Sequence, residues 1–294
     1  MTEPISADTR PWVVMRAHND LPLLTETLAA LAQQTMSFRL AVFDNSSTDG
    51  TREAIAPHAD LVIDIPAGSY IPGKVLNHAM RVTDGCFVIF LNADCTPLHP
   101  ECLQALLDSI QQDTAIAAVF ARQNPRPNCE VLFAKDTNDT YGDGKRQALW
   151  RHCFSMACSC IRRSAWEASA FREDIQYSED IDWTWRIRQQ GRLIRYAADA
   201  QVFHSHNYTL RQYYRRHYGE GAAEARIFDW TPWERSLIRY SLLPFARQVL
   251  SDVNYCLCRG AFAAASYSPF LRLAQMLGRR AGFIAGWKAR NHET

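Results

Sequence analysis

The chain has 294 residues, of which 47% are hydrophobic and 21% are charged. This length and composition allow one large α/β domain with an appended segment, and they exclude a disordered chain. The 32 basic and 31 acidic residues leave a net charge of +1, so the chain lacks the overall positive field that would gather nucleic acid.

Short apolar runs alternate with helical patterns in the first half of the chain. This alternation is typical of βα units, and it predicts a doubly wound, mostly parallel sheet of the Rossmann type. The predicted strands cover residues 12–15, 40–43, 61–65, 87–91 and 116–121. A helix is predicted before the fourth strand, over 73–82, and another between the fourth and fifth strands, over 101–112.

The pattern changes after the fifth predicted strand. Residues 123–144 are rich in Pro, Asn, Asp and Gly, which predicts a long surface loop. A buried strand is expected over 155–162 and a helix over 179–190, with Gly191 as its C-terminal cap. After His206 the strand signals stop, and basic, aromatic helical patterns continue to the end of the chain.

This change suggests two regions. Residues 1–208 are expected to form the catalytic domain, with a nucleotide half at about 11–122 and an acceptor half at about 145–208. Residues 209–294 are expected to form a helical extension, in which 13 basic residues accompany 6 acidic ones. The extension either packs on the catalytic domain or rests as a basic amphipathic surface on anionic lipid.

The cysteines and the N-terminus bear on the compartment. The nine cysteines form no disulfide framework, and the two close pairs are C-x-C and not the C-x-x-C of common zinc and redox sites. The N-terminal residues are polar, and no run reaches the roughly 18 apolar residues of a membrane span. We expect a cytoplasmic protein that is either free or associated with the inner face of the membrane.

Two polar segments follow predicted strands, where open α/β sheets bind ligands. The segment from Phe43 to Thr51 places Asp44 where a carboxylate can accept a hydrogen bond from a nucleotide base; alternatively it is a simple turn. The segment from Phe90 to Pro97 delivers Asp94 to a strand end, as an oxygen ligand for a divalent cation or as a helix cap.

The order and spacing of these two segments resemble family 2 of the nucleotide-sugar glycosyltransferases, whose fold is GT-A. The resemblance covers about residues 11–220 and is close to bacterial rhamnosyltransferase-type members. It implies that the Asp of D-x-S-x-D-G-T contacts the base and that the last acid of D-x-D binds the metal. The first acid of D-x-D is Asn92 here, so Asp94 would do most of the metal binding.

Further positions match the family in this chain. The resemblance implies that the donor nucleotide is also contacted by a set of residues from four loops: Arg16, Asn19, Ser46, Lys74, Asn77 and Asn92. Lys74 lies in a run that matches G-x-x-x-x-G-K, which could be read as a phosphate-binding loop. However, Val75 replaces the Ser or Thr that would bind magnesium, and Pro72 removes a backbone donor.

A third segment, from Tyr177 to Arg186, holds three acids at the start of a predicted helix. Such acids favour the positive end of the helix dipole. The resemblance assigns the catalytic base to the Glu179–Asp180 pair, carried by Asp180, and we place Asp182 and Trp183 on the acceptor side. A carboxylate that removes the acceptor hydroxyl proton is what direct displacement requires.

A fourth segment, from Val202 to Gln212, contains two histidines two residues apart. Histidines at this spacing after a strand project to the same side, and a neutral imidazole is a good metal ligand. His204 or His206 is expected to complete the site of a Mn²⁺ or Mg²⁺ ion. Otherwise each histidine is an ordinary hydrogen-bonded polar residue.

Together these residues predict an inverting, metal-dependent glycosyltransferase. The expected donor is a UDP- or dTDP-sugar, and the expected acceptor is a carbohydrate or lipid-linked saccharide in cell-surface polysaccharide synthesis. The alternatives are a nucleotidyl- or phosphotransferase that uses the Lys74 loop, and a non-catalytic scaffold that binds a nucleotide or glycan.

Overall fold

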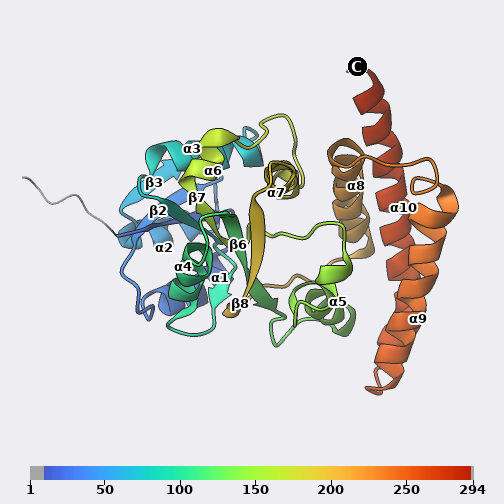
Figure 1. Ribbon diagram of the computed structural model, residues 1–294. Helices are drawn as coiled ribbons and strands as arrows, with labels where there is room; N and C mark the ends of the chain where they lie inside the picture. The colour runs from blue at the N-terminus through green and yellow to red at the C-terminus, as the bar shows by residue number, and fades with distance from the viewer. Residues whose placement is uncertain (1–9, 293–294) are drawn as a thin grey trace, which may run out of the picture.

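The computed structural model describes residues 10–292 of the chain. Within them, eight strands form one sheet in the order β3-β2-β1-β4-β7-β6-β8-β5 (Figure 1). The strands are β1 Trp12–Ala17, β2 Arg39–Asp44, β3 Leu61–Asp64, β4 Phe87–Asn92, β5 Thr96–Pro97, β6 Ile116–Asn124, β7 Cys158–Arg162 and β8 Leu193–Phe203.

Six of these strands run in the same direction. β1 is parallel to β2 and β4, β2 is parallel to β3, and β6 is parallel to β8, while β7 lies antiparallel between β4 and β6. The short β5 pairs antiparallel with the end of β8. The carboxyl ends of β1, β2, β4, β6 and β8 therefore meet at one edge of the sheet, as the mostly parallel prediction implied.

Helices cover both faces of the sheet, which explains why the central strands are almost wholly apolar. One face packs on α1 Leu21–Leu31, α2 Thr51–Ile55 and α4 Cys102–Gln111. The other face packs on α3 Pro72–Val82, α6 Arg163–Ala168 and α7 Glu179–Gln189. The result is the three-layered α/β fold expected from the sequence.

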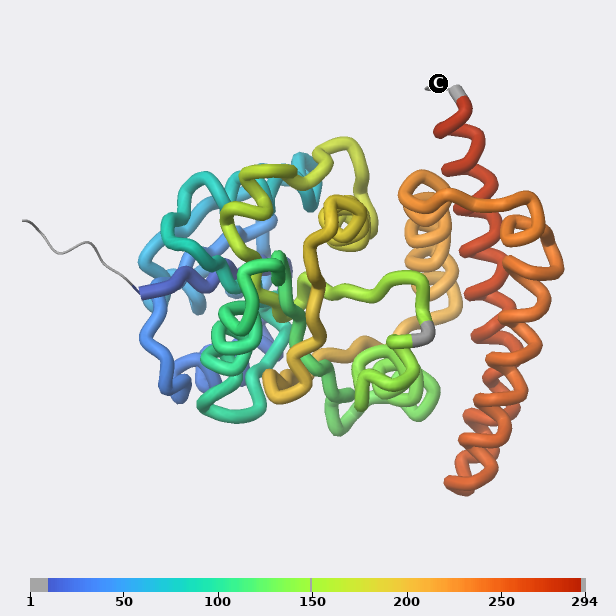
Figure 2. Tube along the Cα trace, in the orientation of Figure 1, coloured from blue at the N-terminus to red at the C-terminus, as the bar shows by residue number. Residues whose placement is uncertain are grey.

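The C-terminal helices stand beside this sandwich (Figure 2). They are α8 Leu210–Ile227, the π-helical turn η3 Ile238–Leu242, α9 Leu243–Leu257 and α10 Phe262–His292. α8 and α10 approach closely because α10 carries glycines every four residues: a Cβ added at Gly282 would lie 1.9 Å from the Tyr218 carbonyl oxygen, and one at Gly286 would lie 2.2 Å from that of Ala222. The helical extension expected from the sequence is therefore present.

The predicted surface loop over 123–144 is wrong. β6 continues to Asn124, and α5 Val131–Tyr141 follows it. Only three residues of α5 are buried, among them Leu132 and Phe133, which pack against Tyr213 of α8. Because so little of the helix is apolar, its formation depends on contacts with distant segments, which local composition does not reveal.

A buried ion-pair network also links α5 to the C-terminal helices. Arg272 of α10 is 1% exposed and bonds to Asp136 of α5 at 2.7 Å and to Asp252 of α9 at 2.7 Å. These contacts cross the predicted boundary at residue 208, which stays a prediction.

Two short 3-10 helices complete the fold, η1 Ala56–His58 and η2 Gln147–Leu149. Gly191 follows α7 with a φ of 82°, as expected of a C-terminal cap.

Candidate active site

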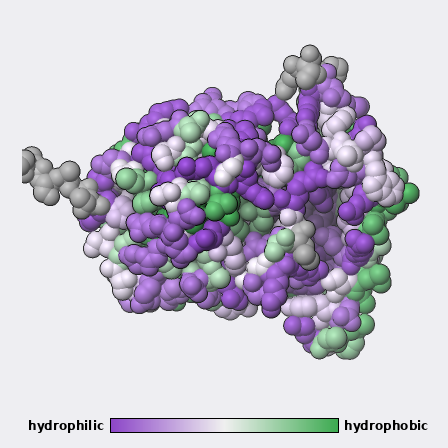
Figure 3. Space-filling model, viewed as in Figure 1, coloured by the Kyte–Doolittle hydropathy of each residue, from purple (hydrophilic) through white to green (hydrophobic). Residues whose placement is uncertain are grey.

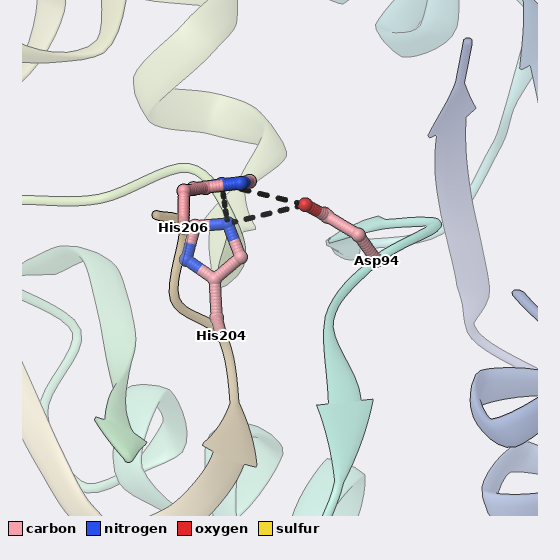
Figure 4. A group of neighbouring side chains, drawn as sticks. All are labelled: Asp94, His204 and His206. Atoms are coloured by element: carbon pink, nitrogen blue, oxygen red, sulfur yellow. Dashed lines mark hydrogen bonds and ion pairs between the residues drawn. The ribbon is translucent and has the colours of Figure 1, made fainter. Parts of the chain in front are cut away.

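Asp94, His204 and His206 form a three-residue cluster at the carboxyl edge of the sheet (Figure 4). Asp94 follows β4, and the two histidines follow β8. The Nε2 atoms of His204 and His206 are 3.2 Å apart, and they lie 3.7 and 3.4 Å from Asp94 Oδ2. Residues more than 100 positions apart in the sequence thus direct three ligand atoms at one point.

A neighbouring amide fixes the orientation of His204. Its Nδ1 lies 2.7 Å from Gln123 Oε1, and Gln123 Nε2 donates to Ser155 Oγ at 2.8 Å. Because the Gln123 oxygen can only accept, Nδ1 carries the proton and Nε2 presents its lone pair to the cluster. Burial lowers the pKa of His204 to about 4 and also lowers that of His206, so both rings are neutral at pH 7.

These three residues fit a divalent cation. Ligands about 2.1 Å from an ion lie roughly 3.0 to 3.4 Å from one another in octahedral or tetrahedral arrangements, and the observed separations are 3.2 to 3.7 Å. The hydrogen bond that His204 Nδ1 donates to the Gln123 oxygen is of the kind that the second ring nitrogen of a metal-bound histidine usually makes. Two imidazole nitrogens suit Mn²⁺ better than Mg²⁺, which prefers oxygen.

Arg126 holds the backbone on both sides of the cluster. Its side chain, 7% exposed, donates to the Asp94 carbonyl at 2.9 Å and forms an ion pair with Glu26 at 2.7 Å. Its backbone N–H donates to Ser205 Oγ, which lies between the two histidines. Arg126 therefore connects the Asp94 loop to the histidine loop.

The loops after β1 and β2 form the next part of the site. Asp44 is 1% exposed; its Oδ2 accepts from the Ser47 N–H at 3.0 Å, while its Oδ1 is buried without a hydrogen-bond partner among the described residues. Asn19 and Ser46 both have positive φ, at 57° and 53°. Asn19 Oδ1 accepts from the Thr48 N–H, so it shapes this loop, and the unpartnered Asp44 oxygen can receive an N–H of a base.

Arg16 connects β4 to α7. It donates to Asn92 Oδ1 at 2.7 Å and lies 3.6 Å from Glu179 Oε1. Burial and the neighbouring Asp180 raise the pKa of Glu179 to about 7, against the opposing effect of Arg16. The guanidinium therefore stands between the strand ends and the acid pair.

Asp180 is held by backbone donors. Its Oδ2 accepts from the Met156 N–H at 3.0 Å, and its Oδ1 accepts from the Ile181 N–H at 2.8 Å. Burial raises its pKa, although both hydrogen bonds and Arg16 act in the opposite direction. Ser178 occupies the N-cap position of α7 with a φ of 59°, but its side chain makes no cap hydrogen bond.

The other two residues predicted on α7 face the protein interior. Trp183 is 0% exposed, packs on Phe171 and donates to the Ser169 carbonyl at 2.5 Å. Asp182 is 3% exposed and is paired with Arg186 at 2.9 Å. The acceptor roles predicted for Asp182 and Trp183 are therefore wrong, because both residues lie on the face of α7 that packs against the core.

Asn77 also differs from the prediction. It is 2% exposed, its Oδ1 accepts from Trp166 Nε1 and the Phe171 N–H, and its Nδ2 donates to Glu173 and the Phe171 carbonyl. All of its hydrogen-bonding capacity is used within the fold. Asn77 is therefore a structural residue and not a donor contact.

The Lys74 loop does not have the features of a phosphate-binding loop. A Cβ on Gly73 would lie 1.8 Å from the Arg172 carbonyl oxygen, so this glycine allows close packing of α3 and is not free to cradle a ligand. Lys74 itself is exposed. These contacts argue against a phosphotransferase built on this loop.

Four residues near the cluster were not predicted. Gln123 and Arg126 lie in the segment interpreted as a loop. Asp20 follows β1, and its pKa is raised to about 6 chiefly by burial, with a contribution from Asp94. Arg216 of α8 contributes to lowering the pKa of both histidines, and no local pattern in the sequence indicates that α8 lies beside them.

The family model described as "Glycosyl transferase family 2" matches residues 12–169. The chain belongs to this family. It is therefore a glycosyltransferase by family, with the GT-A-like fold expected from the resemblance. The matched range includes the Asp44 and Asp94 loops and ends before α7 and the two histidines.

Two curated relatives are O-antigen chain rhamnosyltransferases. WbaN of Salmonella anatum is 31% identical over 212 residues, which are 68% of this chain and 66% of that protein. RfbN of Salmonella typhimurium is 27% identical over 234 residues, which are 75% of this chain and 73% of that protein. The chain thus spans about two thirds of the length of the first of these relatives.

Two solved structures share the fold. A mannosyltransferase from Pyrobaculum calidifontis, in complex with GDP-Man and Mn²⁺, superposes with a TM-score of 0.62 at 18% identity over 98% of this chain and 89% of that one. Glucosyl-3-phosphoglycerate synthase from Mycobacterium tuberculosis, with Mn²⁺, UDP and phosphoglyceric acid, gives 0.57 at 17% identity over 77% and 81%. At these identities the likeness concerns the fold.

Proposed function

We propose that the protein transfers a sugar from a nucleoside diphosphate to a saccharide acceptor by a single, inverting displacement that depends on a divalent cation. The observation that carries this proposal is the Asp94–His204–His206 cluster, at the same sheet edge as the buried Glu179–Asp180 pair. A cation site and a fixed carboxylate at the same edge of the sheet are the minimum that this chemistry needs.

The donor is proposed to lie along the carboxyl ends of β1, β2 and β4. Asp44 Oδ1, buried and unpartnered among the described residues, would accept the N3–H of uracil or thymine. Arg16 and Asn92, which already bond to each other, would face the diphosphate. Asn19 and Ser46 would shape the loop around the base.

The ion, proposed to be Mn²⁺, would be held by Asp94 and both histidines. When bound it offsets the charge that develops on the leaving diphosphate. Gln123 keeps the His204 lone pair directed at the site, and Arg126 keeps the two loops in register.

Asp180 is proposed as the base. Two backbone N–H groups fix its carboxylate, so the oxygen that removes the acceptor hydroxyl proton does not have to be ordered during the reaction. Glu179, close to Arg16, would keep that guanidinium in place. A protonated Asp180 cannot accept the proton of the acceptor hydroxyl, and a protonated Glu179 no longer attracts Arg16. The rate should therefore rise as the pH rises through about 7, the pKa of Glu179.

The relatives bear on the substrates. Two of them are named O-antigen chain rhamnosyltransferases, and we propose a dTDP- or UDP-linked hexose or deoxyhexose as donor. A saccharide, either free or lipid-linked, is proposed as acceptor. Loops determine such specificity, so the fold alone does not choose between these sugars.

The test begins with a thermal-shift screen of UDP- and dTDP-sugars with and without Mn²⁺. A donor at 100 times its dissociation constant should stabilise the fold by about 2.7 kcal/mol, and more strongly with Mn²⁺. NMR of the product should then show an inverted anomeric configuration and release of nucleoside diphosphate. Release of monophosphate, or binding without turnover of any donor, would refute the proposal.

A further inference from the structure

The outer side of the C-terminal helices exposes apolar side chains in two stripes. The first stripe runs from Leu242, the last residue of η3, to Leu250 and Leu257 of α9, which are 43%, 72% and 50% exposed. Their spacing of eight and seven residues returns to the same side of an α-helix. Together with Ala246 and Val253 between them, they form a continuous apolar line along α9.

The second stripe lies on α10. It consists of Phe262, Phe270, Leu273, Leu277 and Ile284, whose exposed fractions run from 41% to 69%. These positions again follow the helical period, while Leu271 and Phe283, one position away from the stripe, are buried against other helices. α10 therefore has one face for the protein interior and a different apolar face for something outside the chain.

The two stripes belong to one hairpin, which we name the α9–α10 face. α9 and α10 lie side by side and are joined by residues 258–261 (Figures 1 and 2). Hydrophobic residues gather along the edge of the molecule over these helices (Figure 3). Single exposed apolar residues are ordinary, but contiguous stripes of this kind mark an interaction surface.

The charge of this region indicates the chemistry of its partner. Residues 235–292 contain nine Arg or Lys residues and one acid, Asp252, which is 0% exposed. Three of the nine form ion pairs within the protein: Arg272, Arg279 and Arg290. Arg239 precedes the α9 stripe and Lys288 follows the α10 stripe, each one helical turn beyond it. Both are exposed, and neither has an acidic partner among the described residues.

We infer that the α9–α10 face binds the surface of an anionic lipid bilayer, with its leucines and phenylalanines among the acyl chains and Arg239, Arg247 and Lys288 among the headgroups. Apolar side chains flanked by basic residues are typical of such interfacial helices. A second copy of the chain would bring the same uncompensated positive charges together, which opposes dimerisation through this face. None of the described helices has the length and apolarity to cross the bilayer, so the contact lies in the interface.

The experiment is co-sedimentation of the full chain with vesicles of equimolar phosphatidylglycerol and phosphatidylcholine, and with vesicles of phosphatidylcholine alone. Binding to the anionic vesicles should exceed binding to the neutral ones by tenfold or more, since each basic residue near the surface contributes about fivefold. The double variant Leu250→Glu/Leu273→Glu should reduce binding to the anionic vesicles at least tenfold, because it places charges where two exposed leucines would enter the acyl chains.

Leu193→Glu is the matched control, since Leu193 is 46% exposed but lies at the start of β8, away from the hairpin. It should bind vesicles as the unaltered chain does. Circular dichroism and UDP binding would show that each variant is folded. Equal binding of the double variant and the control to anionic vesicles would overturn the inference, as would a dimer of the unaltered chain, seen by light scattering, that only the double variant dissociates.

Discussion

The candidate site contains residues at the ends of strands and residues at the start of a helix. The two groups differ in whether all of their side chains reach the site. Asp44, Asn92, Asp94, His204 and His206 follow or end strands, and all of them lie at the carboxyl edge of the sheet. The four residues predicted on α7 lie on two different sides of the helix. Asp180 and Glu179 face the site, whereas Asp182 and Trp183 face the core.

The difference has a geometric cause. A residue that follows a buried parallel strand must emerge at the carboxyl edge of the sheet, whatever the rest of the fold does. A residue on a helix points in a direction set by its position in a 3.6-residue turn and by which side of the helix is packed. Substitutions on the two sides of α7 should therefore differ in their effects on activity and on stability.

The largest effect is expected at Asp180. Asp180→Asn keeps the shape of the side chain but cannot accept a proton, so kcat should fall about 10²–10⁴-fold while donor affinity is unchanged. Steady-state kinetics with a donor identified in the thermal-shift screen measures both kcat and donor affinity.

The matched variant is Asp182→Asn, two residues away on the same helix. It should leave kcat within about threefold and lower stability by about 1–3 kcal/mol, because Arg186 loses its charged partner. Equal losses of kcat in both variants would contradict the assignment of Asp180 to catalysis and of Asp182 to the protein interior.

The next effect concerns stability. Trp183→Ala should lower the free energy of unfolding by about 3–5 kcal/mol, because it leaves a large cavity in the core. Urea denaturation gives this value. The folded fraction should keep the KM for its acceptor. A raised KM for the acceptor without a loss of stability would instead indicate that Trp183 contacts the acceptor.

Gln123 tests the orientation of His204. Removing its amide in Gln123→Ala should weaken Mn²⁺ binding about 10–100-fold, the usual consequence of losing an outer-shell partner. Isothermal titration calorimetry measures this change. Gln123→Glu, which keeps an acceptor for the Nδ1 proton, should lose much less affinity. If both variants bind Mn²⁺ as the unaltered chain does, the ring is oriented by other contacts.

The smallest effect is expected from pH. The pKa of His204 is lowered to about 4 and that of His206 is lowered as well. Between pH 5.5 and 7.5 no proton therefore has to leave His204 when the metal binds. The Mn²⁺ affinity should therefore fall less between pH 7.5 and 5.5 than in a site with two histidines of ordinary pKa 6.5, each of which would cost about tenfold at pH 5.5. The same pKa predicts that the fold loses stability as the pH falls from about 6.5 through 4, since the unfolded chain binds that proton more readily.

The sequence alone predicted the parts of the fold that depend on local pattern. Apolar runs that end in a polar residue located the strands and, with them, Asp44 and Asp94. It did not predict α5, whose helix depends on packing of Leu132 and Phe133 against α8. It also placed Asn77 in the donor site, because a matching spacing cannot tell that its amide is fully bonded to the segment from Trp166 to Glu173.

The central claim is that Asp94, His204 and His206 hold one divalent ion beside the nucleoside diphosphate. Electron paramagnetic resonance of Mn²⁺ tests it most directly, with titrations in the absence and presence of UDP for the unaltered chain, Asp94→Ala and His204→Ala/His206→Ala. We expect one bound Mn²⁺ whose signal changes when UDP is added, and loss of that binding in both variants while circular dichroism stays unchanged. Undiminished Mn²⁺ binding in either variant would contradict it.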